Sequence, residues 1–319
     1  MLLNKGYESF LKQTGSILSD NNSFINTCFN TYKFSTEYGR GYTSIYEVDS
    51  YANICIAEHL YVRNFEYVGV CDDSITIHQY DSIDSEHSYP DGDVYAGMQY
   101  IYYTPDNKLS QYVIKKNTPA KVMGIQLMPE YYENYLKKEF GMKNIDIKKE
   151  LQVFSHGVSI PEISSILNQV RNFKGNKFST KLFFKSKIDE LTAVIIQKAE
   201  EFRSLKTRVS SADRYAIMEI LAYLNKNLSK NLLLSDLAAK AYMSVSKFKY
   251  VFKAVAGQTL SEYTIRKKME YACELLLYSK LYIGEIANLV GYKNSGSFSL
   301  QFKKYTGMLP HDYRISNIK

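Results

Sequence analysis

The chain has 319 residues, of which 45% are hydrophobic and 23% charged, and its formal net charge at pH 7 is +7. This length and composition suit two globular domains, with room for a linker region. No apolar run approaches the ~18 residues of a membrane span, and no apolar segment follows a basic N-terminus, so we expect a cytoplasmic protein without a membrane segment. The four cysteines lack C-x-x-C spacing, which argues against a zinc site and against a disulfide framework.

Residues 24–127 form short runs rich in Tyr, Val, Ile and Thr, mostly separated by Gly, Asp, Asn or Pro. Several runs alternate apolar with polar residues, which is the period of a strand with one buried face. Six or more short strands with regular turns predict a β-sandwich or a partly closed barrel, and we assign it to residues 1–128. The six expected strands are Ser44–Val48, Ala52–Ala57, Phe65–Val70, Ser74–His78, Met98–Tyr103 and Ala120–Leu127.

Few residues in this region indicate chemistry. The sequence has no G-x-S-x-G, G-x-x-x-x-G-K-[ST] or G-x-G-x-x-G motif, so we predict no catalytic residue and no cofactor. His59, His78 and His87 could be imagined as ligands of a cupin-like metal centre. They lack the H-x-H pair and the spaced Glu of such a centre, and we therefore predict no metal site.

A binding pocket is the simplest role for this region, because tyrosines offer an apolar face together with a hydroxyl group. For any single tyrosine, an ordinary core or surface position remains the more common explanation. Residues 1–128 carry nine Lys and Arg against fifteen Asp and Glu, so a small neutral or cationic effector is expected rather than a strongly anionic one. The tyrosines considered are Tyr46, Tyr67, Tyr80, Tyr95, Tyr100 and Tyr102, with Tyr46, Tyr67 and Tyr100 as the pocket candidates.

Beyond Leu127 the pattern becomes helical. Proline begins and glycine follows two expected helices, at 129–140 and 161–173. The longest predicted helix, Lys181–Arg203, has apolar residues at spacings of 4, 3 and 4, which resembles a short heptad seam. Such a seam predicts a homodimer contact, although packing against the helix's own domain would give the same pattern. The seam residues are Phe184, Ile188, Leu191 and Ile195.

We assign residues 129–204 to a helical dimerisation region and the polar stretch 205–212 to a linker. After it come two stretches that are versions of one another. Four residues of the first stretch recur 50 positions later in the second, and a repeat of this kind constrains the fold. These are Phe248, Phe252, Lys253 and Gly257, which recur as Phe298, Phe302, Lys303 and Gly307.

Each copy has the pattern of two short helices joined by a turn. The turn falls at Tyr242 in the first copy and at Gly291 in the second. Glycine adopts a positive φ readily, whereas tyrosine does not, so the first turn must be built differently or be strained. Ser244, and either Asn294 or Ser295, are natural N-caps for the second helix of each copy.

Between the copies, Thr259-Leu-Ser-Glu262 has the form of a capping box, and a helical stripe continues to about Tyr278. The two copies, this connecting helix and the ending Lys303–Pro310 with Tyr313-Arg314 resemble the double helix-turn-helix domain of AraC/XylS-type transcriptional regulators. The resemblance covers about a third of the chain. It implies a DNA-binding domain at 213–319 whose two units enter successive major-groove segments about 34 Å apart.

The resemblance further implies a jelly-roll-like effector and dimerisation domain before the DNA-binding domain. It also implies an activator that works with RNA polymerase and, in some cases, with a small effector. The expected fold is therefore an α+β multidomain protein, with a β-sandwich or barrel and helices followed by an all-α double helix-turn-helix domain. One alternative is a cupin-like enzyme with an autoregulatory DNA-binding domain, and another is a purely oligomerising β domain.

Charge favours nucleic-acid binding over a helical bundle without such a role. From Asp213 onward there are 16 Lys and Arg against 8 Asp and Glu, so the positive charge of the chain comes from this end. The second copy departs from what the family it resembles usually offers, since Gly296 and Leu300 stand in place of side chains able to hydrogen-bond, so this unit is expected to contact mainly phosphates. The residues predicted to contact DNA are Ser244, Val245, Ser246, Lys249, Tyr250 and Lys253 in the first unit, and Asn294, Ser295, Gly296, Ser299 and Lys303 in the second.

Overall fold

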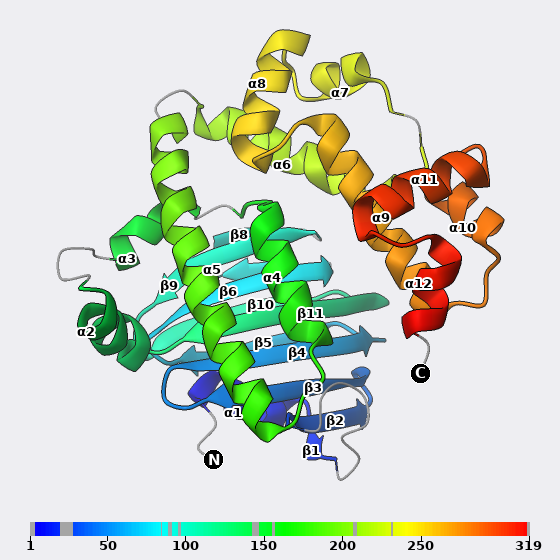
Figure 1. Ribbon diagram of the computed structural model, residues 1–319. Helices are drawn as coiled ribbons and strands as arrows, with labels where there is room; N and C mark the ends of the chain where they lie inside the picture. The colour runs from blue at the N-terminus through cyan, green and yellow to red at the C-terminus, as the bar shows by residue number, and fades with distance from the viewer. Residues whose placement is uncertain are drawn as a thin grey trace. The chain divides into compact units, whose positions relative to one another are not determined.

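A computed structural model of the chain describes residues 4–19, 28–83, 85–88, 91–94, 97–141, 147–154, 157–206, 209–230 and 232–317 (Figure 1). The chain forms two compact units, Met1–Arg208 and Val209–Lys319. The first unit combines antiparallel sheets with helices and the second is helical, so the predicted α+β multidomain fold is confirmed. In the described ranges, no helix is both long and apolar enough to cross a lipid bilayer.

The first unit begins with helix α1 (Lys5–Gln13) and contains two antiparallel sheets. The larger sheet has the strand order β1-β2-β3-β4-β11-β6-β9, and the smaller has the order β5-β10-β7-β8. All six predicted strands are present, and the structure adds β1, β2, β7, β8 and β10. The bounds are β1 Ile17–Leu18, β2 Asn30–Thr36, β3 Gly39–Val48, β4 Ala52–Tyr61, β5 Phe65–Cys71, β6 Ser74–Ser82, β7 Ser85–Ser88, β8 Asp91–Val94, β9 Met98–Thr104, β10 Lys108–Ile114 and β11 Thr118–Leu127.

The central strands of the larger sheet are buried on both faces. Strand β11 pairs with β4 along its whole length and with β6 on its other side. Because side chains alternate between faces, Ile54 and Ile56 of β4 enter the core shared with the helices, whereas Cys55 and Ala57 belong to a different cluster. Each central strand therefore contributes to two separate interiors.

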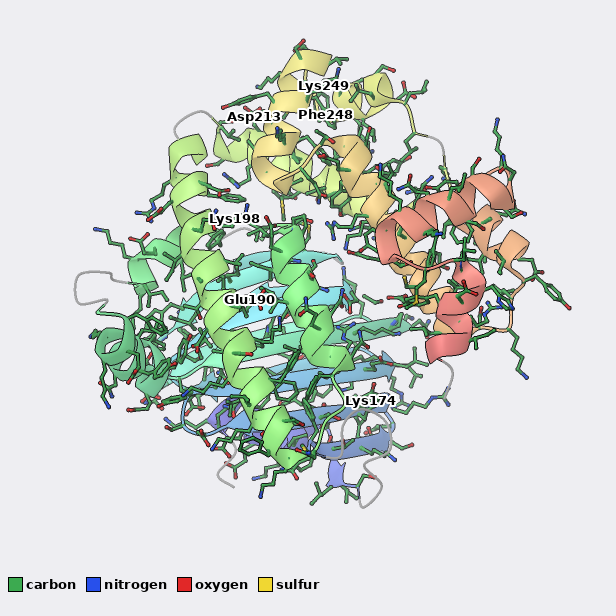
Figure 2. All side chains as sticks on the ribbon, viewed as in Figure 1. Lys174, Glu190, Lys198, Asp213, Phe248 and Lys249 are labelled. Atoms are coloured by element: carbon green, nitrogen blue, oxygen red, sulfur yellow. The ribbon has the colours of Figure 1, made fainter. Side chains whose placement is uncertain are left out.

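Helices cover one face of the larger sheet, as Figure 1 shows for α4 (Pro161–Asn172) and α5 (Lys177–Lys206). The two helices share one buried core, and Lys198 of α5, labelled in Figure 2, also forms an ion pair with Glu162 of α4, with Nζ 3.1 Å from Oε1. Shorter helical segments precede them: a π-helical turn at Glu130–Tyr135, α2 (Leu136–Phe140), α3 (Ile147–Glu150) and a 3-10 turn at Leu151–Phe154. The helix predicted at 129–140 thus begins as a π-helical turn, and it ends at Gly141 with a φ of +66°.

The seam predicted for dimerisation lies inside this unit. Its four residues have at most 2% of their surface exposed and share one core with the sheet, so they are not available for a contact between chains. The seam pattern therefore reflects packing of α5 against its own domain. The residues concerned are Phe184, Ile188, Leu191 and Ile195.

The predicted boundary at residue 128 does not separate two units, because the strands and α4 and α5 share that core. The predicted linker, 205–212, begins and ends within helices. Helix α5 continues to Lys206, and α6 begins at Ser211.

In the described residues of the second compact unit, the regular elements are all helices. Helix α6 (Ser211–Lys226) is followed by two pairs of helices and by the longer α9 (Leu260–Tyr278) between the pairs. The capping box predicted for α9 is confirmed, because Thr259 Oγ1 accepts from the backbone N–H of Glu262 at 3.3 Å and Glu262 accepts from that of Thr259 at 2.8 Å. The remaining helices are α7 (Leu234–Lys240), α8 (Val245–Ala256), α10 (Ile283–Leu289), α11 (Ser295–Thr306) and α12 (Pro310–Asn317).

Candidate DNA-binding surface and ligand cavity

The turns between α7 and α8 and between α10 and α11 begin with the same backbone hydrogen bonds. In the first turn, Tyr242 N–H donates to Ala239 at 3.0 Å and Met243 N–H donates to Ala238 at 2.9 Å. In the second, the N–H groups of residues 291 and 292 donate to Asn288 and Ala287 at 2.9 and 2.8 Å. The two copies therefore form two helix-turn-helix units of matching local geometry.

The position that requires a left-handed backbone holds Gly291 in one unit and Tyr242 in the other. Their φ angles are +78° and +55°, so the tyrosine adopts the conformation that glycine adopts. Of the two possibilities for the first turn, a different construction or a strained one, the structure has the strained one. At Gly291 a side chain is also sterically excluded, because a Cβ atom would lie 2.7 Å from the carbonyl oxygen of Ser229.

The second helix of each unit begins at a capped residue. Ser244 accepts a hydrogen bond from the N–H of Lys247, and Asn294 accepts one from the N–H of Ser297 at 2.8 Å. These bonds confirm Ser244 and identify Asn294, rather than Ser295, as the second N-cap. The repeated phenylalanines are buried in both units, so the opposite face of each helix is exposed. They are Phe248, Phe252, Phe298 and Phe302.

The residues predicted to contact DNA lie on these outer faces. In α8, Phe248 enters the core while its neighbour Lys249 faces solvent (Figure 2). All the remaining predicted residues are exposed except Ser299, which is half-buried. Their role in DNA contact remains a prediction. The exposed residues are Ser244, Val245, Ser246, Lys249, Tyr250 and Lys253 in the first unit, and Asn294, Ser295, Gly296 and Lys303 in the second.

The outer face of α11 has an apolar centre. Leu300 leaves 72% of its surface exposed, and Gly296 precedes it by one helical turn. Lys303 and Lys304 follow one turn later and are also exposed. The second unit thus presents an aliphatic side chain beside two ammonium groups.

Polar contacts join the first helix-turn-helix unit to α6 and α6 to α9. Lys247 at the start of α8 binds Asp213 of α6 at 2.8 Å, and this contact lowers the pKa of Asp213. In addition, the buried Tyr263 of α9 donates to Asn225 of α6 at 2.8 Å. Helix α6 is therefore bonded both to the start of α8 and to α9.

The sequence did not indicate the role of Arg314. Its guanidinium donates to the carbonyl of Leu276 at 3.2 Å and to that of Leu281 at 2.8 Å. It thereby binds a carbonyl group near the C-terminal end of α9, where backbone carbonyls lack helical partners, and a second one in the chain that follows. The neighbouring Tyr313 packs against Phe302, with ring centroids 5.4 Å apart. Tyr313 and Arg314 therefore make contacts inside the C-terminal compact unit rather than pointing into solvent.

The N-terminal of the two compact units contains a cavity of about 190 Å³. Its lining comes from the inner faces of both sheets and from α1, which contributes Tyr7 and Phe10. Of the three pocket candidates, Tyr67 lines the cavity. Tyr46 lies on the helix-covered face, with its ring 5.1 Å from that of Phe184, so its predicted pocket role is wrong. The reason is the strand period of two, which sends Tyr46 to the face opposite Ile45.

The third candidate, Tyr100, is buried beside the cavity, and its ring lies 5.7 Å from that of Tyr80. Among the described lining residues, Tyr80 and Tyr102 occur and Tyr100 does not. Tyr95 lies outside the described residues. The structure thus has a tyrosine-lined cavity that includes Tyr67 of the three candidates, and ligand binding there stays a prediction.

Two histidines line this cavity. His59 Nε2 lies 2.9 Å from Thr43 Oγ1, and His59 Nδ1 lies 3.1 Å from the hydroxyl of Tyr61. Burial lowers the pKa of both His59 and His78 to about 4, so both are neutral near pH 7. In the part of the chain that the structure describes, no group of three or more His, Cys, Asp or Glu could hold a metal ion. The His87 side chain is outside that description.

A sequence profile of the helix-turn-helix domain matches residues 237–316 of this chain. The chain is 32% identical over 101 residues to the HTH-type transcriptional activator AarP of Providencia stuartii, which is 32% of this chain and 75% of AarP. It is 38% identical over 95 residues to the MmsAB operon regulatory protein of Pseudomonas aeruginosa, which is 29% of this chain and 30% of that protein. The C-terminal domain of AraT, a response regulator from Geobacillus stearothermophilus, matches at 33% identity, with 35% of this chain and 90% of that chain covered and a TM-score of 0.31.

The chain belongs to the AraC-type family of helix-turn-helix transcriptional regulators. Its matches to the other curated relatives span only 30% to 46% of their length. The similarity lies in the C-terminal compact unit, which is therefore an AraC-type DNA-binding domain.

Proposed function

We propose that this protein is a sequence-specific, ligand-responsive regulator of transcription, acting as an activator with RNA polymerase. The observation that carries the proposal is the repeated helix-turn-helix geometry, in which both second helices expose one face beyond a buried pair of phenylalanines. A helix exposed in this way can lie in the DNA major groove, whose edges distinguish the base pairs. The excess of basic residues in this unit supports phosphate binding.

Both units act together in this proposal. Each helix would enter one of two neighbouring major-groove segments, about 10 base pairs apart on one face of the duplex. In the first unit Lys249 and Tyr250 offer polar groups to base edges or phosphates. In the second unit Lys303 and Lys304 suit phosphates, which carry no base identity.

Substitution of one lysine tests this proposal. Binding sites would first be selected from random duplex DNA, and the affinity of the full chain measured at two salt concentrations. If Lys249 contacts a guanine edge, Lys249→Ala should cost about 1–3 kcal/mol and relax the preference at one base pair. If it contacts a phosphate, binding should weaken on all sequences and the salt slope should fall by about one.

The matched control is Lys174→Ala, which removes an exposed lysine from the N-terminal compact unit, outside the helix-turn-helix domain (Figure 2). It should leave affinity and salt slope unchanged. If Lys249→Ala also leaves both unchanged, α8 does not dock as proposed. Nuclease protection restricted to one segment rather than two would contradict docking by both units.

We further propose that the N-terminal compact unit binds an effector and forms the homodimer. The cavity supports the effector role, because ligand sites are concave and mostly apolar with a few polar groups. For the dimer, α5 offers Phe178 and Leu182, which lie one turn apart and are 79% and 64% exposed. An effector regulates only if it binds one arrangement of the protein better than another, and DNA then alters effector affinity by the same factor.

A further inference from the structure

We propose that the cavity of the first unit binds an uncharged, single-ring molecule that is mainly apolar and carries one or two hydrogen-bonding substituents. This inference rests on the proposed effector role and defines the chemical class of the effector. It also narrows the expectation from sequence, which allowed a neutral or a cationic ligand. Four properties of the cavity lead to it.

The first property is charge. The described residues that line the cavity include no Asp, Glu, Lys or Arg. A charged ligand would therefore lose its hydration without gaining an ionic partner there, and an unpaired buried charge is costly. The two lining histidines do not supply a charge near neutral pH. The acidic balance of the unit lies elsewhere and does not select a cation.

The second property is size. At about 190 Å³ the cavity is slightly larger than the ~150 Å³ apolar cavities that admit benzene. One ring with a short substituent fits this volume, whereas a fused polycyclic compound or a nucleotide does not.

The third property is shape and surface. Aromatic rings from α1 and from both sheets surround the space, and two of them, Tyr67 and Tyr112, stack with centroids 4.7 Å apart. Phe10 of α1 stacks on His59 at 5.5 Å. Flat aromatic walls favour a flat ligand, because ring faces and edges then meet at van der Waals distance.

The fourth property is the supply of hydrogen bonds. Several polar lining groups already have partners: both nitrogens of His59 are hydrogen-bonded, and Gln126 bonds with Asn4 and with Ser74, which lies outside the lining. A ligand with many hydroxyls would have to compete with these bonds inside the cavity. This argues for an apolar ring and against a polyhydroxylated one.

His78 is the best-placed group for the polar substituent. Its Nδ1 lies 3.2 Å from the hydroxyl of Tyr80 and 3.4 Å from that of Tyr102. When one of these phenols donates to the single lone pair of Nδ1, the proton of the neutral imidazole resides on Nε2. The ring lies directly over Gly124, where a Cβ would be 2.8 Å from Nε2. Gly124 thus makes room for the imidazole beside the cavity.

The test uses three probes of one shape and different charge. Benzyl alcohol, benzylammonium and benzoate would be titrated into the full chain at pH 7.5 by calorimetry, with D-ribose as a polyhydroxylated ring. We expect saturable one-to-one binding of benzyl alcohol. Each ion should bind at least about 100-fold more weakly, because its charge would be buried without a partner. D-ribose should not bind measurably.

Two variants locate the binding. Ala57→Leu extends an alkyl group into the cavity from β4 and should abolish binding of benzyl alcohol. Tyr80→Phe removes the hydroxyl beside His78 and should weaken binding several-fold. Its matched control, Tyr46→Phe, removes a hydroxyl on the helix-covered face and should leave affinity unchanged. Tyr80→Phe and Tyr46→Phe each remove only one oxygen atom. Their comparison therefore remains informative if Ala57→Leu does not fold.

Tighter or equal binding of either ion, or of D-ribose, would overturn the proposed ligand class. Failure of all probes to bind, or binding that persists in a folded Ala57→Leu chain, would overturn the site. DNA affinity measured on the same samples separates this inference from the proposed function. A chain that binds DNA but no probe contradicts only the inference, whereas one that binds no DNA contradicts the proposed function.

Discussion

Tyr242 holds a left-handed backbone conformation, although 96% of its surface is exposed. Its side chain therefore gains little packing energy to offset the strain. We expect Tyr242→Gly to raise the free energy of unfolding of the C-terminal compact unit by about 0.5–1 kcal/mol, because glycine adopts this φ without a Cβ clash. The measurement is chemical denaturation of the full chain, followed by a signal from the helical unit.

Tyr282 provides the control for this prediction. It is also exposed, at 79%, but its φ is −67° and the backbone there is unstrained. Tyr282→Gly should therefore bring no gain in stability. A loss of stability in Tyr242→Gly would show that the tyrosine makes a stabilising contact that outweighs its backbone strain.

We expect Leu300 to let the second helix-turn-helix unit recognise sequence without a hydrogen bond, because its side chain is largely exposed. An aliphatic side chain on the outer face of a major-groove helix can contact the methyl group of thymine. On a selected binding site, Leu300→Ala should cost about 0.8 kcal/mol, roughly a fourfold loss of affinity. Replacing the contacted thymine with deoxyuracil removes the same methyl group and should cost a similar amount.

The two changes to this contact should not add. If Leu300 and the methyl group touch, the leucine variant will be insensitive to deoxyuracil at that base pair. Deoxyuracil placed in the segment read by α8 is the control and should affect both proteins equally. Additive losses at every thymine of the second segment would exclude the contact.

At the scale of the elements, α5 shows how a pattern can have two explanations. The spacing of its apolar residues is the same for a seam between chains and for packing on a sheet. Only the structure shows that Leu191 is fully buried within its own unit while Leu182 is exposed. Leu191→Glu should therefore unfold the first unit, because it buries an unpaired carboxylate.

Leu182→Glu tests the alternative dimer contact. If Phe178 and Leu182 lie between two chains, this variant should give a folded monomer by light scattering, with unchanged circular dichroism. Glu190→Leu is a control on the same helix, where Glu190 binds Lys187 at 2.7 Å (Figure 2). A dimer that persists in Leu182→Glu would place the contact on another surface.

The sequence was most informative where a period or a cap depends on neighbouring residues. The repeated phenylalanines, the Thr259 capping box and the central strands follow from local spacing, and all were predicted. The strand β10 was missed, because Lys108–Ile114 mixes polar and apolar residues without a clear alternation. The cavity lining required the register of several strands at once, so Tyr46 could not be assigned to its face from sequence.

For the whole molecule, the buried histidines make stability depend on pH. The pKa of His59 and of His78 is about 4 in the folded chain against an ordinary 6.5, because burial disfavours the charged imidazolium. The unfolded chain therefore binds more protons between these values. The contribution of these neutral histidines to the free energy of unfolding is fully present above pH 6.5. It is lost as the pH falls towards 4, by up to about 3 kcal/mol for each histidine.

Denaturant titrations from pH 7 to pH 4 measure this dependence. Replacing His59 or His78 with Gln should reduce the slope of unfolding free energy against pH, whatever the change in absolute stability. His311→Gln is the control, because His311 lies exposed on α12. An unchanged slope in both buried-site variants would show that other groups govern the acid sensitivity.

The two-sided burial of β4, β6 and β11 has a consequence for how such proteins diversify. Neighbouring residues such as Ile56 and Ala57 belong to different interiors, one holding the helices and the other facing the cavity. Mutations at alternate positions of one strand can therefore change what the cavity accepts while leaving the helix-bearing face intact. Single substitutions can therefore reshape the cavity without passing through intermediates that have lost their fold.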